Sequence, residues 1–169
     1  MTSEVLNRLD GDAGVRRTLA RLGDSIFRRD PEAHGECYAP DGEWHAFGSI
    51  VQGRQAVVDH WWNVMQGFPF VRQTISSLVI EVDGDTAASR GHVDEVLRMP
   101  DGSYQVVMGI YHSTFQKYGT EWLIKVHRYD QVYYGSPALD GKFFPIMEYG
   151  RPPYDPDPAR MTAMMDISL

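Results

Sequence analysis

Residues 73–134 read QTISSLVIEVDGDTAASRGHVDEVLRMPDGSYQVVMGIYHSTFQKYGTEWLIKVHRYDQVYY. Apolar and polar residues alternate along this stretch, and three turn sequences interrupt it: Asp83-Gly84-Asp85, Pro100-Asp101-Gly102 and Tyr118-Gly119-Thr120. Asp-Gly and Pro-Asp-Gly are strong hairpin signals, because glycine and aspartate accept the backbone angles of tight turns. The pattern predicts an antiparallel meander with strands at residues 73–82, 86–99, 103–117 and 121–134.

Helical patterns precede the meander. Apolar residues recur on one helical face at Val15, Leu19, Leu22 and Ile26, and Asp10 or Asp12 is placed to cap that helix. A second, short helix is predicted to start at Asp30-Pro31-Glu32, which supplies an N-cap, a first-turn proline and an early acid. A third helix is predicted over residues 54–65, after a short strand at residues 43–47. This order predicts an α+β fold, with the helices segregated from an antiparallel sheet.

Length and composition indicate one domain followed by an extension. The chain has 169 residues, which is enough for a single hydrophobic core. Six of its ten prolines fall in residues 135–169: Pro137, Pro145, Pro152, Pro153, Pro156 and Pro158. We therefore expect a domain at residues 1–134 and a Pro-rich C-terminal extension at residues 135–169, packed on the domain or on a neighbouring subunit. A short helix is expected at residues 159–165.

Charge and cysteine content exclude several classes of protein. The formal net charge is -7 and no basic block exists, so we expect no nucleic-acid partner. No apolar run approaches the ~20 residues of a membrane span, and residues 1–10 lack the apolar core of a signal peptide. We therefore expect no membrane partner and a cytoplasmic location. Cys37 is the only cysteine, phosphate-binding glycine loops are absent, and the histidine spacing matches no ligand motif, so we expect neither metal nor cofactor.

Polar side chains interrupt the apolar rows of the meander. If every hairpin loop holds three residues, the even-numbered residues of all the strands share one face. That face is rich in apolar residues, and we expect it to line the interior together with a polar cluster: Arg90, His92, Asp94, His112 and Arg128. The same register pairs Arg90 with His112 and His92 with Ile110. A single β-bulge would reverse the faces and would place another polar set inside: Tyr111, Lys125, His127 and Tyr129.

Short motifs along the chain resemble one protein family. They are Tyr38-Ala39-Pro40-Asp41-Gly42-Glu43-Trp44, Gly53-Arg54-Gln55-Ala56, Ile80-Glu81-Val82-Asp83-Gly84-Asp85-Thr86-Ala87 and Glu121-Trp122-Leu123-Ile124. In this order they resemble the SnoaL-like branch of the nuclear-transport-factor-2-like superfamily. The resemblance implies a cone-shaped α+β barrel: a strongly curved antiparallel sheet around three N-terminal helices, with a deep apolar pocket and assembly as a homodimer or homotrimer. Members include scytalone dehydratase, lindane dehydrochlorinase, ketosteroid isomerase and polyketide cyclases, so the fold alone does not set the activity.

The Asp–His pair that the resemblance implies for the dehydratase and dehydrochlorinase members is absent from this chain. Its aspartate corresponds to Phe27 and its histidine to Gln73. Asp24 lies one turn before Phe27 on the same helix face, and is a candidate for a displaced carboxylate. Arg72, beside Gln73, is a candidate cation.

The candidate chemistry is general acid–base catalysis. A histidine near a carboxylate is a suitable proton acceptor, so we expect His92 with Asp94, or Asp24, to act as the base. His112 and Arg128 complete the expected catalytic group, by moving a proton or by holding negative charge. The residues expected to bind the substrate are Trp44, Trp61, Arg72, Gln73, Arg90, Met108, Ile110, Tyr111 and Tyr129.

These candidates predict a cofactor-independent lyase or isomerase that acts on a small-molecule substrate. Dehydration, another β-elimination or retro-aldol cleavage would use the same groups, and the many aromatic residues suit an apolar, aromatic substrate and a role in its catabolism. Two alternatives remain open. One is a non-catalytic ligand-binding or assembly module of the same fold. The other is a polyketide cyclase or epoxide hydrolase, for which Asp94, Arg90 and Asp24 would have to converge.

Overall fold

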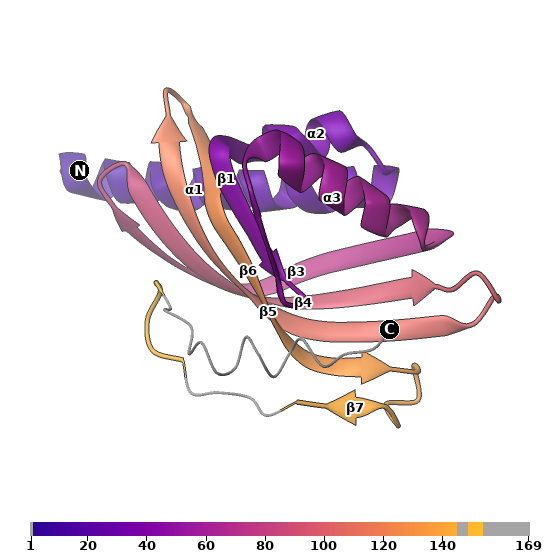
Figure 1. Ribbon diagram of the computed structural model, residues 1–169. Helices are drawn as coiled ribbons and strands as arrows, with labels where there is room; N and C mark the ends of the chain where they lie inside the picture. Colours follow the sequence, from indigo (N-terminus) through magenta and orange to yellow (C-terminus); the bar gives the residue numbers. More distant parts are fainter. Residues whose placement is uncertain (1, 145–148, 154–169) are drawn as a thin grey trace.

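One strongly curved, unclosed sheet organises the molecule. The computed structural model describes residues 2–144 and 149–153. In this part of the chain the helices lie on the concave side of the sheet, and the segment after the meander lies on its convex side (Figure 1). The strand order is β2-β1-β6-β5-β4-β3, with β7 beside β6. Only the β1–β6 pair among these is parallel. The predicted α+β class and the curved sheet around N-terminal helices are confirmed.

The helices and strands follow the predicted order, and several of them are longer than predicted. The helices are α1 (Ser3–Arg28), α2 (Pro31–Glu36) and α3 (Arg54–Gln66). The strands are β1 (Tyr38–Ala46), β2 (Ser49–Gln52), β3 (Phe70–Asp83), β4 (Thr86–Arg98), β5 (Tyr104–Tyr118), β6 (Glu121–Gly135) and β7 (Lys142–Phe143). Strand β2 was not predicted, and β1 begins five residues before the predicted strand. None of the described helices is both long and apolar enough to cross a membrane.

Helix α1 begins earlier than its apolar stripe indicates. Its N-cap is Thr2, whose hydroxyl accepts a hydrogen bond from the Val5 amide at 3.4 Å, so the prediction of Asp10 or Asp12 as the cap is wrong. The first two turns are exposed and have no core face, which is why apolar periodicity does not reveal them. Helix α2 starts as predicted, because the Asp30 side chain accepts from the Ala33 amide and Pro31 opens the first turn.

Trp122, at the start of β6, anchors α1 to the sheet. The Trp122 side chain is fully buried, and its indole nitrogen donates to Asp10 at 3.3 Å. The Thr18 hydroxyl donates to the Trp122 carbonyl oxygen. Gly14 lies directly over the indole, where a side chain would overlap the ring. These contacts hold α1 across the concave face and place its buried stripe above the sheet.

Loop lengths in the meander differ from the prediction at two turns. Asp83 pairs with Thr86 and Tyr118 with Glu121, so the first and third loops hold two residues and not three. The middle loop is three residues long, as predicted, and the Met99 amide donates to the Ser103 carbonyl at 2.9 Å. Bulges between residues 76 and 79 of β3 and beside residues 114 and 115 of β5 restore the parity that the short loops shift. The β4–β5 register depends only on the middle loop and has no bulge, and the predicted pairs of Arg90 with His112 and His92 with Ile110 are confirmed.

The even-numbered face of the central strands is convex, so the prediction that it lines the interior is wrong. His92 and Asp94 are exposed on it. The opposite, odd-numbered face packs against the helices, and it carries small residues in place of a continuous apolar row: Ala87, Ser89, Gly91, Gly109 and Ser113. Side chains converge on the concave side of a bent sheet, and small residues relieve that crowding. The polar appearance of this face in the sequence therefore reflects curvature and not exposure to water.

The segment after the meander contacts the convex face. Strand β7 pairs with the end of β6, and the Phe144 amide donates to the Val132 carbonyl at 2.9 Å. Farther along, the Tyr149 hydroxyl donates to Asp130 at 2.6 Å and Arg90 donates to the Gly150 carbonyl at 2.6 Å. The helix expected at residues 159–165 lies outside the described residues. The expected packing of the whole extension stays a prediction.

The contact between Gly14 and Trp122 predicts opposite effects of one substitution at two helix positions. Gly14→Ala should lower the free energy of unfolding by about 1–2 kcal/mol, because overpacking the buried indole outweighs the gain in helix propensity. Gly23→Ala is the matched control. It lies on the same helix with no side-chain atom within 4 Å of its added Cβ, so it should raise the free energy by about 0.5–1 kcal/mol. Urea unfolding measures both, and stabilisation by both would contradict the docking.

Candidate functional site

A cavity of about 280 Å³ lies between the concave face of the sheet and the three helices. Its walls are mostly apolar and aromatic, which is typical of small-molecule sites. The lining residues that the argument uses are Trp44, Trp61, Gln73, Glu95, Tyr111 and Gln131. Neighbouring strands β3, β4 and β5 supply Gln73, Glu95 and Tyr111, and α3 supplies Trp61. The cavity therefore combines an apolar wall with a few polar groups.

A glutamine–carboxyl pair forms the first polar feature of this cavity. Gln73 and Glu95 are direct partners in the β3–β4 register, and the Gln73 amide nitrogen donates to the Glu95 carboxyl at 2.5 Å. Burial raises the pKa of Glu95 above its ordinary value of 4.5, and the hydrogen bond from Gln73 offsets part of that rise. A carboxyl group whose pKa rises towards neutrality is suited to accept a proton in one step and return it in another.

Tyr111 forms the second polar feature. Burial is the main cause of its raised pKa, and the nearby negative charge of Glu95 raises it further. Hydrogen bonds with the Trp44 and Gln73 side chains act in the opposite direction. Tyr111 also stacks on His127, with ring centroids 3.7 Å apart, which fixes the plane of its ring. Its hydroxyl therefore stays protonated and serves as a positioned hydrogen-bond donor.

Buried histidines near the cavity are neutral. His34 lines the cavity and stacks on Trp61 with centroids 4.0 Å apart, and burial lowers its pKa to about 3. His127 lies behind Tyr111, and burial likewise lowers its pKa to about 3. The Ser113 hydroxyl lies 2.7 Å from Nδ1 of His127. No lysine or arginine is among the described residues that line the cavity; a second lining histidine is His60 on α3, and Glu95 is the one carboxyl group there.

The structure separates the predicted catalytic residues from this cavity. His92 and Asp94 lie on the convex face of β4 and are exposed, and neither lines the cavity. His112 and Arg128 are buried on the same convex face, where His112 lies 3.7 Å from Asp130. The even-numbered cluster therefore shares a face as predicted, but that face is not the interior. A catalytic role for these residues stays a prediction.

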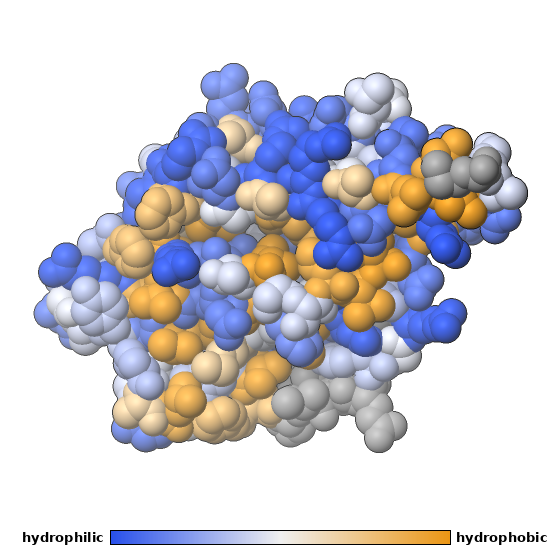
Figure 2. All heavy atoms as spheres, turned by 180° about the vertical axis from the view of Figure 1, so that it is seen from behind, coloured by the Kyte–Doolittle hydropathy of each residue, from blue (hydrophilic) through white to orange (hydrophobic). Residues whose placement is uncertain are grey.

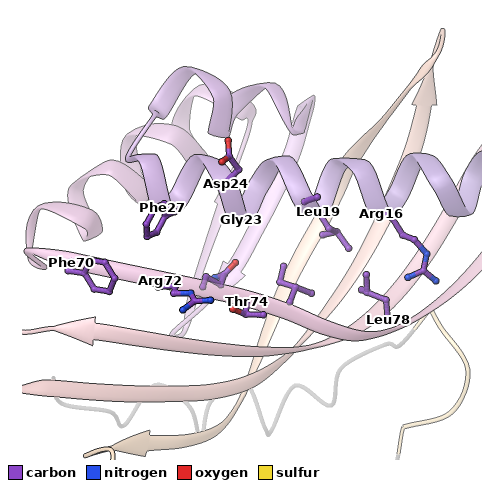
Figure 3. Close-up of a pocket in the computed structure, with 12 residues that line it drawn as sticks. Arg16, Leu19, Gly23, Asp24, Phe27, Phe70, Arg72, Thr74 and Leu78 are labelled. Carbon is purple, nitrogen blue, oxygen red and sulfur yellow. The ribbon is translucent and has the colours of Figure 1, made fainter.

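Asp24 lies at the rim of a second hollow, an open groove of about 830 Å³ between α1 and β3. Figure 3 shows Asp24 on the side of α1 turned away from β3, with Phe27 pointing towards Phe70. Asp24 pairs with Arg28 at 2.7 Å, and both side chains are exposed. Arg72 lines the floor of this groove. Figure 2 shows apolar side chains along this hollow.

The positions of the missing Asp–His pair meet at this groove. Phe27 and Gln73 both line it, and Gln73 also lines the interior cavity. Phe27 is 57% exposed and its ring meets Phe70 edge to face at 6.2 Å. The structure thus brings the two positions to one groove, as the resemblance implies, with an aromatic ring where the relatives' carboxylate is expected.

The predicted substrate-binding residues divide between three places. Trp44, Trp61, Gln73 and Tyr111 line the cavity, and Tyr129 packs behind Tyr111 with ring centroids 5.4 Å apart. Arg90, Met108 and Ile110 belong to the convex face, and Arg72 to the groove. The set of Asp94, Arg90 and Asp24 does not converge, because Asp24 is on α1 and the other two are on the convex face of β4. That finding removes the geometric basis for the epoxide-hydrolase alternative.

Sequence reasoning missed Glu95 and Gln131. Glu95 follows Asp94 directly, so choosing the wrong face of β4 discards one residue and keeps the other. The strand register could have revealed Glu95, because Glu95 pairs with Gln73, which occupies the position of the relatives' histidine. Tyr111 was weighed as an interior residue for a reversed face, and the structure places it there. Lys125 belongs to the same reversed-face set, but it does not line the cavity and forms an ion pair with Asp41.

Comparisons with known proteins agree with this fold. The SnoaL-like domain family matches residues 7–128 of the chain. The crystal structure of LinA has a TM-score of 0.73 and 18% sequence identity, covering 84% of this chain and 98% of LinA. A scytalone dehydratase-like protein from Novosphingobium aromaticivorans has a TM-score of 0.72 and 18% identity, covering 84% and 97%. Rv3472 from Mycobacterium tuberculosis, a protein of unknown function, has a TM-score of 0.65 and 25% identity, covering 70% of each chain. No curated protein sequence matches.

The raised pKa of Glu95 predicts how stability depends on pH. Between the ordinary pKa of 4.5 and the higher folded-state pKa, the folded protein keeps a proton that the unfolded chain releases, so Glu95 lowers stability as pH rises. Glu95→Gln cannot ionise. Its free energy of unfolding should therefore rise relative to wild type from pH 4 towards neutral pH, as measured by urea unfolding at each pH.

The matched control for this series is Glu81→Gln, which removes a carboxylate from β3 outside the cavity. Its unfolding curve should stay parallel to that of the wild type over the same pH range. Parallel curves for wild type and Glu95→Gln would contradict a raised pKa of Glu95 in the folded protein.

Proposed function

The chain belongs to the SnoaL-like family, and from that premise we propose that it is a cofactor-independent lyase or isomerase acting on a small, largely apolar molecule inside the concave cavity. The solved structures that share its fold include a dehydrochlorinase, LinA-type3, and a scytalone dehydratase-like protein. Their identity to this chain is 17% and 18%, so they support the fold and leave the reaction to be argued from the site.

One observation carries the proposal: a carboxyl group, Glu95, and a phenol, Tyr111, line the same apolar cavity. Glu95 has a raised pKa because it is buried, and Tyr111 stays a hydrogen-bond donor for the same reason. Pairs of titratable groups with separated pKa values are typical of acid–base sites. In an apolar cavity a hydrogen bond to a developing negative charge is also stronger than in water.

An elimination uses these groups without a cofactor. The Glu95 carboxylate takes a proton from the carbon next to a carbonyl group, and the electrons of that C–H bond form the new C=C bond. The leaving group departs from the neighbouring carbon with its bonding electrons, either as halide or as hydroxide that takes the proton from Glu95 and leaves as water. Tyr111 donates a hydrogen bond to the carbonyl oxygen while negative charge gathers there. An isomerase would return the same proton to another carbon.

The cavity walls favour a flat substrate. Trp44 and Trp61 line the cavity, and Tyr111 presents a ring whose plane is fixed by stacking on His127. Aromatic walls of this kind bind planar apolar groups through offset and edge contacts. This supports an aromatic or conjugated substrate, and with it the expectation of aromatic catabolism.

A non-catalytic ligand-binding module is the second candidate function. Phe27 and Gln73 occupy the positions of the relatives' Asp–His pair, and Asp24, His92 and Asp94 all lie outside the cavity. On this view Glu95 only hydrogen-bonds a ligand. The two functions differ in one observable: a binder holds the molecule unchanged, while a lyase or isomerase releases a different one.

Turnover by variants of two adjacent carboxylates tests the proposal. The assay follows the ultraviolet absorbance of the conjugated product from a panel of aromatic β-hydroxy and β-halo ketones. Glu95→Gln should lower kcat about 10²–10⁴-fold, because it removes the proton acceptor. Tyr111→Phe should lower kcat about 10-fold or more, because it removes the hydrogen-bond donor to the developing charge.

The matched comparison is Asp94→Asn, which removes the neighbouring carboxylate from the opposite face of the same strand. It should leave kcat within about 2-fold of the wild type, since exposed charges contribute little to a distant site. If Asp94→Asn loses activity and Glu95→Gln keeps it, the convex-face prediction is right and the cavity proposal is wrong. Binding of a molecule that is never converted would favour the second candidate.

A further inference from the structure

Gln131 on β6 presents an unused amide to the cavity. Its side chain is 1% exposed, and it is one of the residues that line the cavity. Neither its amide nitrogen nor its amide oxygen has a hydrogen-bond partner in the described part of the chain. An unpaired buried polar group costs about 1–3 kcal/mol, whereas an apolar side chain of similar size would cost nothing here. The amide therefore points to a partner outside the described part of the chain.

The backbone around Gln131 is built to aim this side chain inwards. Gln131 pairs with Gly109 of β5, next to the bulge that separates Met108 from Gly109. A side chain at Gly109 would overlap the ring of Tyr129, so only glycine allows β6 to approach β5 this closely. Tyr129 and Gln131 share the concave face of β6. The Tyr129 hydroxyl donates a hydrogen bond to the Met108 carbonyl at 3.2 Å.

Gln131 lies at a distance from the Gln73–Glu95 pair. Glu95 is on β4 and Gln131 on β6, with β5 between them. Strands two apart in a sheet are separated by about 10 Å, so the two side chains start from backbones about that far apart. A ligand that satisfies both needs two polar groups at opposite ends of an apolar body.

The charge of the cavity restricts those polar groups further. Glu95 is the one carboxyl group among the described lining residues, no lysine or arginine lies there, and burial keeps the lining His34 neutral. A carboxylate, sulfate or phosphate on the ligand would enter without a lysine or arginine to pair with it, which is costly in an apolar site. The volume of about 280 Å³ lies at the lower end for small-molecule pockets and excludes a large nucleotide-like handle.

We propose that Gln131 is a second polar anchor of the substrate, and that the cavity takes an uncharged, flat molecule with hydroxyl or carbonyl groups at both ends. The Gln131 amide binds the end remote from the reaction, and Glu95 with Tyr111 binds the reacting end. The inference rests on the proposed function for the identity of the reacting end. The anchor itself rests on the unpaired amide and its position.

Binding of four naphthalene probes at pH 7 tests the anchor, with quenching of tryptophan fluorescence as the readout because Trp44 and Trp61 line the cavity. The probes are 2-naphthol, 2,6-dihydroxynaphthalene, 2,3-dihydroxynaphthalene and 2-naphthoate. The 2,6-diol should bind wild-type protein about tenfold more tightly than 2-naphthol, because its second hydroxyl reaches Gln131. The 2,3-diol, with both hydroxyls at one end, should gain less than about threefold, and 2-naphthoate should bind at least about tenfold more weakly than 2-naphthol.

Gln131→Leu should abolish the advantage of the 2,6-diol while changing the affinity for 2-naphthol by less than about threefold. Gln116→Leu is the control, since this β5 glutamine donates to the Asp85 carbonyl outside the cavity. The control variant should keep the full advantage of the 2,6-diol.

An advantage that survives in Gln131→Leu overturns the anchor, and equal binding of 2-naphthoate and 2-naphthol overturns the charge restriction. Either failure is distinct from failure of the proposed function, which shows as turnover that does not depend on Glu95. If no probe binds, the ligand class is wrong.

Discussion

The bend of the sheet is the constraint on which the rest of this structure depends. A strongly curved sheet crowds the side chains on its concave face, so that face must carry small residues at the bend. Gly91 and Gly109 occupy these positions on neighbouring strands, and a side chain at Gly109 would overlap the Tyr129 ring. Ser89 and Ser113 add little volume beside them. The helices then cover the concave side, and Trp122 fixes α1 in place by direct contact with Gly14.

Curvature also decides which polar groups meet. Gln73, Glu95 and Tyr111 come from neighbouring strands and converge because the sheet wraps around the cavity. The surrounding apolar and aromatic wall raises the pKa of Glu95 and keeps Tyr111 protonated. On the convex side the same strands carry His112 and Arg128, which are buried and lie next to Asp130. The two faces of one sheet thus hold two polar groups, and among the described residues the concave group lines the cavity that we propose for the substrate.

Local patterns were sufficient to predict most of the fold. Turn sequences located the meander, Asp30-Pro31 located α2, and the register of Arg90 with His112 followed from counting. Counting could not show which face is concave: two loops are one residue shorter than expected and bulges compensate for them, so the parity was right but the choice of the inner face was wrong. Ser89, Gly91 and Ser113 also read as a water-facing row, although they are small because the sheet bends there. Glu95 was missed because the opposite face of β4 was taken as the interior. No local sequence pattern marks Gln131 as a cavity residue.

A crystal structure with a bound small molecule tests the central claim most directly. The protein would be crystallised with the compound it retains on purification, or with 2,6-dihydroxynaphthalene. The account predicts electron density for that molecule in the concave cavity, with one polar atom within hydrogen-bonding distance of Glu95 or Tyr111 and another near Gln131. Density beside His92 and Asp94 on the convex face, with no density in the cavity, would contradict it.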